Sequence, residues 1–229
     1  MRRSPHAHAK TAPPQRGTLR PHAAPNPATA SHAPPMPHPA GQNGLLVIVS
    51  GPSGAGKTTI ARALHAAFPG SHLSLSLTTR PIGPTEQEGV DYHFVSEEEF
   101  QKGVDQGAFL EHAGVYGKRY GTPRKPVEDA LAQGRLVILE IDVQGAKQVK
   151  AQIPDALGLF VRAPSEDELL RRLRARQRDS EEVIQRRFAR AQTENAEALR
   201  CGVYDRFIVN DQLERAADEA TAAVRERLH

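Results

Sequence analysis

The sequence predicts an α/β fold in which a mostly parallel core sheet is flanked by helices. Three observations support this expectation. Apolar runs of strand length recur along the chain, helical patterns lie between them, and a glycine-rich turn follows the first run. Strands that alternate with helices favour parallel pairing, because parallel neighbours need a crossover connection.

The expected strands are short runs dominated by Leu, Ile and Val. Residues 45–50, 136–141 and 157–161 are apolar almost throughout, as expected of strands buried on both faces of a sheet. Residues 72–78 alternate between apolar and polar side chains and predict one further strand. Residues 207–209 predict a short last strand.

Helical patterns occupy most of the segments between these strands. The first begins directly after the glycine-rich turn and ends before Pro69-Gly70. Ser165 and Glu168 have the spacing of a capping box at the start of a later helix. The expected helices cover residues 58–68, 127–133, 146–152, 166–176, 181–199 and 213–228.

Two stretches depart from this alternation. Residues 76–126 include a segment rich in Gly, Tyr and charge, with strand patterns at 91–95 and 108–112, and predict a small inserted lobe. Residues 171–190 are strongly basic and helical, and predict a mobile lid. Both belong to one folded domain, residues 41–229.

Residues 1–40 are predicted to be a disordered tail. They hold ten prolines, five histidines and five Lys or Arg, but no Asp or Glu. Such a segment buries too little apolar surface to offset the entropy of ordering it. Without the tail, the formal charge of +3 becomes −2, from 25 basic and 27 acidic residues. The basic isoelectric point therefore does not indicate nucleic-acid binding.

Cellular location is predicted from cysteine content and the lack of targeting signals. Cys201 is the only cysteine, so an intramolecular disulfide is impossible, which favours the reducing cytoplasm. No apolar run is long enough to span a membrane, and the tail lacks the apolar segment of a secretory signal. The tail's composition faintly resembles an organellar transit peptide, but its prolines oppose the amphipathic helix that such a peptide needs.

A phosphate-binding loop follows the first strand. Its residues match G-x-x-x-x-G-K-[ST] between a buried strand and a helix, the context that this motif requires. Backbone N–H groups of such a loop point at phosphate oxygens, and the helix N-terminus adds partial positive charge. Lys57 is expected to reach the β- and γ-phosphates and Thr58 to bind Mg²⁺. The alternative is a glycine turn with an incidental lysine. The loop is Gly51, Pro52, Ser53, Gly54, Ala55, Gly56, Lys57 and Thr58.

The inserted lobe resembles the GMP-binding region of guanylate kinases. The matching segments are Ser76-Leu77-Thr78-Thr79-Arg80-Pro81, Glu86, Gly89-Val90-Asp91-Tyr92-His93-Phe94, Phe109-Leu110-Glu111, Tyr120-Gly121-Thr122 and Leu139-Glu140-Ile141-Asp142-Val143-Gln144-Gly145. The resemblance runs from Gly44 to the C-terminus. It implies a P-loop nucleoside-monophosphate-kinase fold that transfers the γ-phosphoryl group of MgATP to GMP, and conceivably to dGMP.

The resemblance also implies contacts to GMP. Arg80, Tyr92 and Tyr120 would hold the phosphate, since a guanidinium and phenols are suitable donors. Glu111 and Glu140 would accept the N–H donors of guanine, with Ser76 and Thr122 beside the base. These assignments have plainer alternatives. The tyrosines could be packing residues of edge strands, and Glu111 could face solvent by alternation.

Two carboxylates near the end of residues 136–141 predict contacts to a ligand or a metal ion. A carboxylate that ends a buried strand is costly unless it has a partner or a ligand, and this applies to Glu140. Asp142 lies two residues later and could hold Mg²⁺ through water, as a carboxylate after a core strand does in P-loop enzymes.

Gly83 departs from the family pattern. Guanylate kinases usually carry a second arginine three residues after the one matched by Arg80. Here this position is Gly83, between Ile82 and Pro84. Either one phosphate contact is lost, or the turn needs a glycine with positive φ. At the position of Glu140, many members of the family carry Asp.

The basic lid holds nine arginines between residues 162 and 190. The resemblance implies that Arg172 lies near ATP, that Arg176 and Arg187 act over the phosphates during transfer, and that Asn210 lies near the adenine. A solvated helical face is the alternative, and it is favoured for Arg171, Arg174, Arg178 and Arg186. An RNA-binding role is disfavoured because neither an RNA-module motif nor an interleaved series of aromatic residues accompanies the arginines.

Three rival functions stay open at this stage. They are a monophosphate kinase with another base preference, a non-catalytic binding module of the guanylate-kinase-like type, and a P-loop ATPase that acts on a macromolecule. The expected partners are ATP and GMP, with no nucleic acid or membrane. A homo-oligomer is neither predicted nor excluded.

Deletion of residues 1–40 is expected to leave catalysis and melting temperature almost unchanged. The tail contains none of the matched motifs and almost no large apolar residues. The full-length and truncated chains would be compared by steady-state kinetics and thermal unfolding. A large fall in either quantity would show that the tail docks on the domain.

Overall fold

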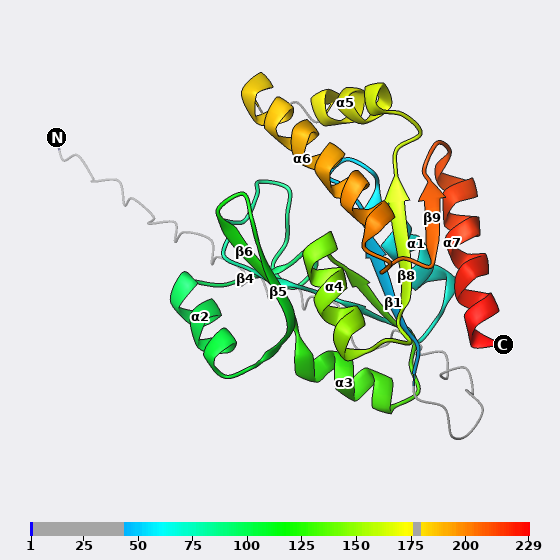
Figure 1. Ribbon diagram of the computed structural model, residues 1–229. Coiled ribbons are helices and arrows are strands. Elements are labelled where there is room, and N and C mark those ends of the chain that lie inside the picture. The colour runs from blue at the N-terminus through cyan, green and yellow to red at the C-terminus, as the bar shows by residue number, and fades with distance from the viewer. Residues whose placement is uncertain (2–43, 176–179) are drawn as a thin grey trace. The chain divides into compact units, whose positions relative to one another are not determined.

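The core of the protein is a five-stranded parallel sheet with the strand order β2-β7-β1-β8-β9 (Figure 1). The computed structural model describes Met1, residues 44–175 and residues 180–229. The tail prediction thus concerns residues that, apart from Met1, lie outside the described ones. The predicted mostly parallel α/β sheet is confirmed. Its strands are β1 (Leu46–Ser50), β2 (His72–Ser74), β7 (Val137–Glu140), β8 (Leu157–Arg162) and β9 (Arg206–Val209).

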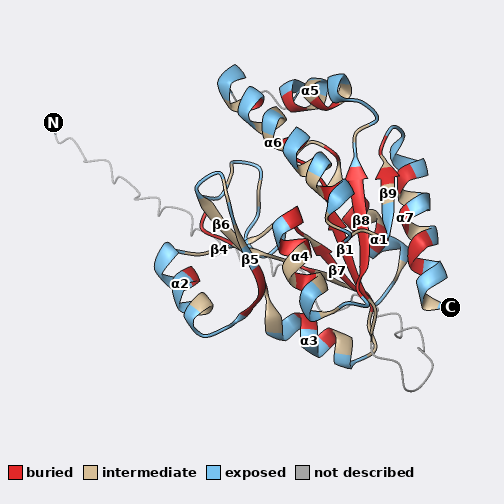
Figure 2. Ribbon diagram, viewed as in Figure 1, coloured by how far each residue is buried: buried red, intermediate tan, exposed pale blue. Residues whose placement is uncertain are grey.

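Strand β1 lies in the middle of the sheet and is buried on both faces. Alternate side chains enter two different apolar clusters: Val47 and Val49 in one, Leu46 and Ile48 in the other. All four are at most 2% exposed. This explains why the strand reads as a continuous apolar run rather than an alternating one. Figure 2 shows the same concentration of buried residues along the central strands.

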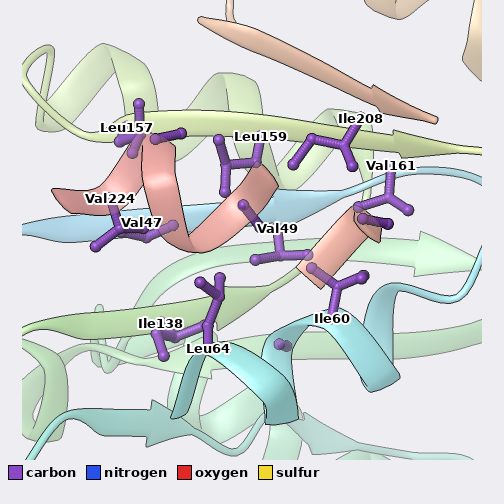
Figure 3. Packing of buried hydrophobic residues seen from close by; sticks show 14 of the residues in the cluster. Val47, Val49, Ile60, Leu64, Ile138, Leu157, Leu159, Val161, Ile208 and Val224 are labelled. Carbon is purple, nitrogen blue, oxygen red and sulfur yellow. The ribbon is translucent and has the colours of Figure 1, made fainter. Parts of the chain in front are cut away.

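Helices cover both faces of the sheet. Helix α1 (Lys57–Ala67) and helix α7 (Leu213–Leu228) share one apolar cluster with β1, β7, β8 and β9. Figure 3 shows Ile60 and Leu64 of α1 and Val224 of α7 around the strand residues of this cluster. Helices α3 (Arg124–Ala132) and α4 (Val143–Gln152) pack against the opposite face. A two-sided cover of this kind is what an all-parallel sheet requires.

The segment predicted as one strand at residues 72–78 is two strands in different sheets. Strand β2 pairs with β7 in the core, whereas β3 (Leu77–Thr78) pairs with β4 and β6 in the inserted lobe. The chain leaves the core sheet between them. The alternating pattern continues across the break, which is why the sequence did not reveal it.

The inserted lobe is a four-stranded sheet with the order β4-β3-β6-β5 and one helix. Its further elements are β4 (His93–Phe94), α2 (Glu97–Asp105), β5 (Phe109–Val115) and β6 (Lys118–Pro123). Helix α2 and strand β6 were not predicted. The signal for α2 was present, because Ser96 and Glu99 form a reciprocal capping box at its start.

The segment predicted as a lid, residues 171–190, falls on two helices: α5 (Glu166–Ala175) and α6 (Glu181–Arg200). They pack through Leu169, Leu173, Ile184 and Ala191. The Ser165 hydroxyl accepts the backbone N–H of Glu168 at 3.1 Å, so the predicted N-cap is present. The carboxylate of Glu168 binds Arg171 and Arg172 instead of completing a capping box. In the described residues, no helix is long and apolar enough to cross a membrane.

Phe100 is expected to hold the lobe together. Its side chain is 0% exposed and its ring stacks on that of Phe109 at 4.6 Å between centroids. Phe100→Ala should lower the free energy of unfolding by roughly 3–5 kcal/mol, the range for a buried phenylalanine. Urea unfolding would measure this, with the exposed Lys102→Ala on the same helix as control. Equal stability of the two variants would contradict this packing role.

Candidate functional site

The phosphate-binding loop connects β1 to α1 and needs its glycines for steric reasons. A Cβ on Gly51 would lie 2.1 Å from the Val161 carbonyl oxygen, and the φ of Gly51 is 144°. A Cβ on Gly56, whose φ is 97°, would lie 2.2 Å from Nδ2 of Asn210. Only glycine fits both the backbone conformation and the space at these two positions.

The loop ends at the N-terminus of α1. The Nζ atom of Lys57 donates to the Pro52 carbonyl oxygen at 3.2 Å, so the amine folds back over its own loop. The first turn of α1 contains no acidic residue. The lysine and the positive end of the helix dipole together favour an anion at this place.

Asn210 and Arg172 meet beside the phosphate loop. Asn210 is 7% exposed, and its Nδ2 donates to the Ala55 carbonyl oxygen at 2.8 Å. Arg172 donates from Nη2 to the Asn210 carbonyl oxygen at 2.9 Å and from Nε to Glu168 at 2.7 Å. Thus the two residues predicted for the ATP side lie together at the phosphate loop. Arg172 comes from α5, and Asn210 directly follows β9.

The hydroxyl of Thr58 donates to a Glu140 carboxylate oxygen at 2.8 Å. Glu140 ends β7, next to β1, so the parallel alignment brings the carboxylate to the start of α1. A small pocket of about 40 Å³ lies between α1 and the lobe, and its lining includes Thr58, Ser76, Tyr92 and Glu140. Glu140 therefore faces a pocket that it shares with Thr58 on the phosphate-loop side and with Ser76 and Tyr92 on the predicted GMP side.

Glu111 is a buried carboxylate in β5. It is 4% exposed and accepts the backbone N–H of Thr122 at 3.1 Å and the Thr122 hydroxyl at 2.6 Å. Burial raises the pKa of Glu111 to about 7; the hydrogen bonds from Thr122 oppose the rise, and the negative charge of Asp142 adds to it. Glu111 thus does not face solvent, which excludes the plainer interpretation from strand alternation.

The structure places Asp142, rather than Glu140, next to Glu111. Asp142 caps α4, where it accepts the Gly145 backbone N–H at 2.9 Å. A Cβ on Gly145 would lie 2.4 Å from Oε2 of Glu111. From the sequence, Glu111 and Glu140 were expected at the base and Asp142 at the metal. The observed grouping is different, and it favours an exchange of the roles of Glu140 and Asp142.

Arg80 lies at the centre of the other predicted GMP contacts. It forms a bidentate ion pair with Glu86 at 2.7 and 2.8 Å and donates to the Tyr120 hydroxyl at 3.3 Å. Its guanidinium lies 5.5 Å from the centroid of the Tyr92 ring. The hydrogen bond with Glu86 is the main cause that raises the pKa of Arg80, so it stays charged. Arg80, Tyr92 and Tyr120 are therefore brought together as predicted.

Gly83 does not have the positive φ that one interpretation required, because it is absent from the described glycines with this conformation. That interpretation is wrong as stated. The Gly83 N–H donates to Oε2 of Glu86 at 2.8 Å, and a Cβ on Gly83 would lie 2.7 Å from the same oxygen. Any side chain there would press on the carboxylate that holds Arg80. The interpretation as a lost phosphate contact stays a prediction.

The arginines of α6 face the tip of the lobe. The guanidinium of Arg187 lies 5.7 Å from the ring centroid of Tyr116, and that of Arg190 lies 4.9 Å from it. Arg190 also pairs with Glu194 at 2.7 Å and with Asp142 at 3.3 Å. Arg176, predicted as the second lid arginine, lies outside the described residues.

Tyr116, Arg190 and Glu194 were not predicted as site residues from the sequence. The helical spacing of Arg187, Arg190 and Glu194 on one face of α6 was an available signal. The contact to Tyr116 could not be read from it, because Tyr116 lies on another element. Among the described residues, no group of three or more His, Cys, Asp or Glu side chains forms a ready metal site.

Comparison with known proteins agrees with this geometry. The sequence model of the guanylate kinase family matches residues 43–227. The chain belongs to the guanylate kinase family. Guanylate kinases of Anaeromyxobacter dehalogenans and Symbiobacterium thermophilum are 52% and 50% identical to it, over 81% and 79% of this chain and 82% and 84% of theirs.

A solved structure supports the same assignment. The guanylate kinase from Anaplasma phagocytophilum matches with a TM-score of 0.65 and 32% identity, over 82% of this chain and 87% of that one. The family assignment makes the chain a nucleotide-binding kinase, a transferase that acts on a nucleoside monophosphate. The P-loop kinase fold expected from the sequence is thereby confirmed.

The buried Glu111 predicts a pH-dependent stability in the absence of nucleotide. Its folded pKa of about 7 lies above the ordinary value of 4.5, so the unfolded state releases the proton first as pH rises. The associated stability is present below pH 4.5 and is lost by about pH 7. Glu111→Gln, which cannot ionise, should therefore gain stability relative to wild type over this range. The gain is on the order of 3 kcal/mol.

Urea unfolding at pH 5 and pH 8 would measure this difference. The exposed Glu98→Gln is the matched control, since it removes a carboxylate without changing a buried one. A Glu111→Gln protein that follows the wild-type pH profile would show that Glu111 does not titrate as its burial implies.

Proposed function

We propose that the chain transfers the γ-phosphoryl group of ATP to GMP, giving ADP and GDP. The observation that carries the proposal is the pairing of the buried Glu111 with the partly buried Asp142 next to a complete phosphate-binding loop. Guanine presents N1–H and N2–H₂ donors on one edge. Adenine has no N1–H, so two carboxylates at this place favour guanine.

The ATP side is assigned to the residues around the phosphate loop. Backbone N–H groups of the loop, residues 51–58 apart from Pro52, would bind the phosphate oxygens, and Lys57 would contact the β- and γ-phosphates. Arg172 and Asn210 are held at the loop by their mutual hydrogen bond. They would lie beside the adenine and ribose of ATP.

The donor set next to Lys57 fits Mg²⁺. Thr58 and Glu140 offer a hydroxyl and a carboxylate within hydrogen-bond distance of each other, and Mg²⁺ prefers oxygen ligands and phosphates over all-protein cages. When bound with ATP, the ion neutralises charge on the β- and γ-phosphates. From the sequence, a water-mediated contact to Mg²⁺ was expected of Asp142. Asp142 instead pairs with Arg190, whereas Glu140 contacts Thr58, so Glu140 is the better-supported candidate for the Mg²⁺ contact.

The acceptor phosphate is assigned to Arg80, Tyr92 and Tyr120. Glu86 holds the guanidinium of Arg80 bidentately, so the arginine is oriented before the substrate arrives. Ser76 lines the pocket next to Tyr92, and Thr122 is fixed to Glu111. These two hydroxyls would complete the contacts to GMP. The same contacts do not involve the ribose 2′-hydroxyl, so dGMP is a further candidate.

The proposed reaction needs no covalent intermediate on the protein. An oxygen of the GMP phosphate attacks the γ-phosphorus in line, and the bond to the β-phosphate oxygen of ADP breaks. Lys57, Arg187 and Arg176 would stabilise the charge that spreads over the transferred oxygens. The lid would exclude water, which otherwise competes as the acceptor.

The domain organisation and the location also stay proposals. We assign residues 41–229 to the kinase domain, with the lobe at about 76–126 and the lid at about 171–190. The single cysteine supports a reducing cytoplasm.

A coupled assay of ADP release with GMP, AMP, UMP and dTMP tests the function. We expect turnover with GMP and little with the others. Lys57→Ala should lose on the order of 10²-fold or more in rate, because one charge-stabilising contact is removed. Turnover with another base would change the substrate, hydrolysis without any acceptor would indicate an ATPase, and no turnover would indicate a binding module.

Conservative variants distinguish the two carboxylates of the β7–α4 connection. Asp142→Asn should raise the KM for GMP by roughly 5- to 100-fold, the equivalent of one poorly paired guanine donor, while asparagine still caps α4. Glu140→Gln should mainly raise the Mg²⁺ concentration needed for half-maximal rate.

The exposed Asp129→Asn on α3 is the control for both variants. Steady-state kinetics over a matrix of GMP and Mg²⁺ concentrations would separate the effects. The opposite pattern, with Glu140→Gln affecting GMP and Asp142→Asn affecting Mg²⁺, would restore the assignment made from the sequence.

A further inference from the structure

The hairpin between β5 and β6 has an unusual residue at its tip. The two-residue connection is Tyr116-Gly117, with φ values of 52° and 73°. Such a turn favours Asn, Asp or Gly at both positions, because they tolerate positive φ. Among the described residues, Tyr116 is the only non-glycine residue with positive φ. The choice of tyrosine is thus not explained by the turn.

The ring of Tyr116 contacts the lid instead. Three guanidinium groups of α6 lie near its face, with their Cζ atoms at 4.9 Å (Arg190), 5.7 Å (Arg187) and 5.9 Å (Arg186) from the centroid. An aromatic face attracts cations through its quadrupole at these distances. Tyr116 therefore links the inserted lobe, which carries the predicted GMP contacts, to the helix that carries a predicted phosphate contact.

Arg190 connects this contact to the base side of the site. Its Nε pairs with Glu194 on the same helix at 2.7 Å, and its Nη2 reaches Asp142 at 3.3 Å. Glu194 has a side chain only 14% exposed, so it holds Arg190 from a largely buried position. The Tyr116 ring lies over a guanidinium that is already fixed at one end and directed at Asp142.

We propose that Tyr116 is a positioning residue for phosphoryl transfer. Its ring holds the arginine face of α6 against the tip of the lobe, so that Arg187 and Arg190 are oriented when both substrates are bound. The proposal rests on the proposed function. The left-handed backbone conformation of Tyr116 is energetically unfavourable. On this proposal it is tolerated at the hairpin tip because the reaction requires an aromatic ring there.

The variant Tyr116→Asn separates the turn from the ring. Asparagine suits the left-handed conformation, so the melting temperature should stay the same or rise. Loss of the ring should lower kcat at saturating ATP and GMP by roughly 3- to 30-fold, the range of a cation–π contact. Tyr116→Phe keeps the ring and should stay within about twofold of wild type by the same reasoning.

A second readout is the ratio of ATP consumed to GDP formed. When the arginine face is not held against the lobe, water can reach the γ-phosphate, and the ratio should rise above one in Tyr116→Asn. Lys118→Ala, in the same hairpin, leaves the Tyr116 ring in place; it is the control and should leave kcat and the ratio unchanged. Arg190→Lys combined with Tyr116→Asn should cost less than the sum of the single changes.

The outcomes separate the two proposals. If wild type forms no GDP from GMP, the proposed function fails before Tyr116 is tested. If wild type is active, and Tyr116→Asn keeps its kcat and a ratio of one at unchanged or higher melting temperature, the positioning role is overturned. An equal fall in kcat in Tyr116→Asn and Tyr116→Phe would likewise overturn it, because Tyr116→Phe keeps the ring and the ring could then not be the cause of the effect.

Discussion

The parallel alignment of the core strands is the constraint on which the site depends. Because β1, β7, β8 and β9 run the same way, the segments after their carboxyl ends meet at one edge of the sheet. The phosphate loop, Glu140 with Asp142, the start of the lid and Asn210 each follow one of these strands. Hydrogen bonds between sequence-distant residues, such as Asn210 to Ala55 and Thr58 to Glu140, follow from this alignment.

Two neighbouring carboxylates set the electrostatic character of the site. Glu111 is buried beside Asp142, whose negative charge makes ionisation of Glu111 less favourable. Thr122, the α4 N-terminus and Arg190 offset part of this cost. Under the proposed function, the N–H donors of guanine would relieve the rest. A site prepared for a donor-rich base would then cost stability in the absence of that base.

The sequence predicted the core well and the lobe poorly, for physical reasons. Residues 45–50 and 157–161 belong to strands buried on both faces, whose apolar runs need no tertiary information. Within residues 72–78, apolar and polar side chains alternate in the same way in β2 and in β3, although these strands belong to different sheets. Only the strand pairing in the structure reveals the break between them. The phosphate-binding loop could be predicted because the spacing of its Gly, Lys and Thr residues is itself typical of phosphate binding. By contrast, Glu111 lies in the lobe sheet and Asp142 caps a helix of the core, so their proximity depends on how the lobe meets the core.

The lobe is a continuous insertion between β2 and α3. The chain enters it after Ser74 and leaves it at Pro123, directly before α3 begins on the core. The segment between these points can be exchanged as one cassette without a new connection in the parallel sheet. Under the proposed function, such an exchange in evolution would alter the acceptor nucleotide while the ATP-handling half stayed intact. Asp142 lies outside the cassette, so on the same proposal a change of base preference would also require a matching substitution in the core.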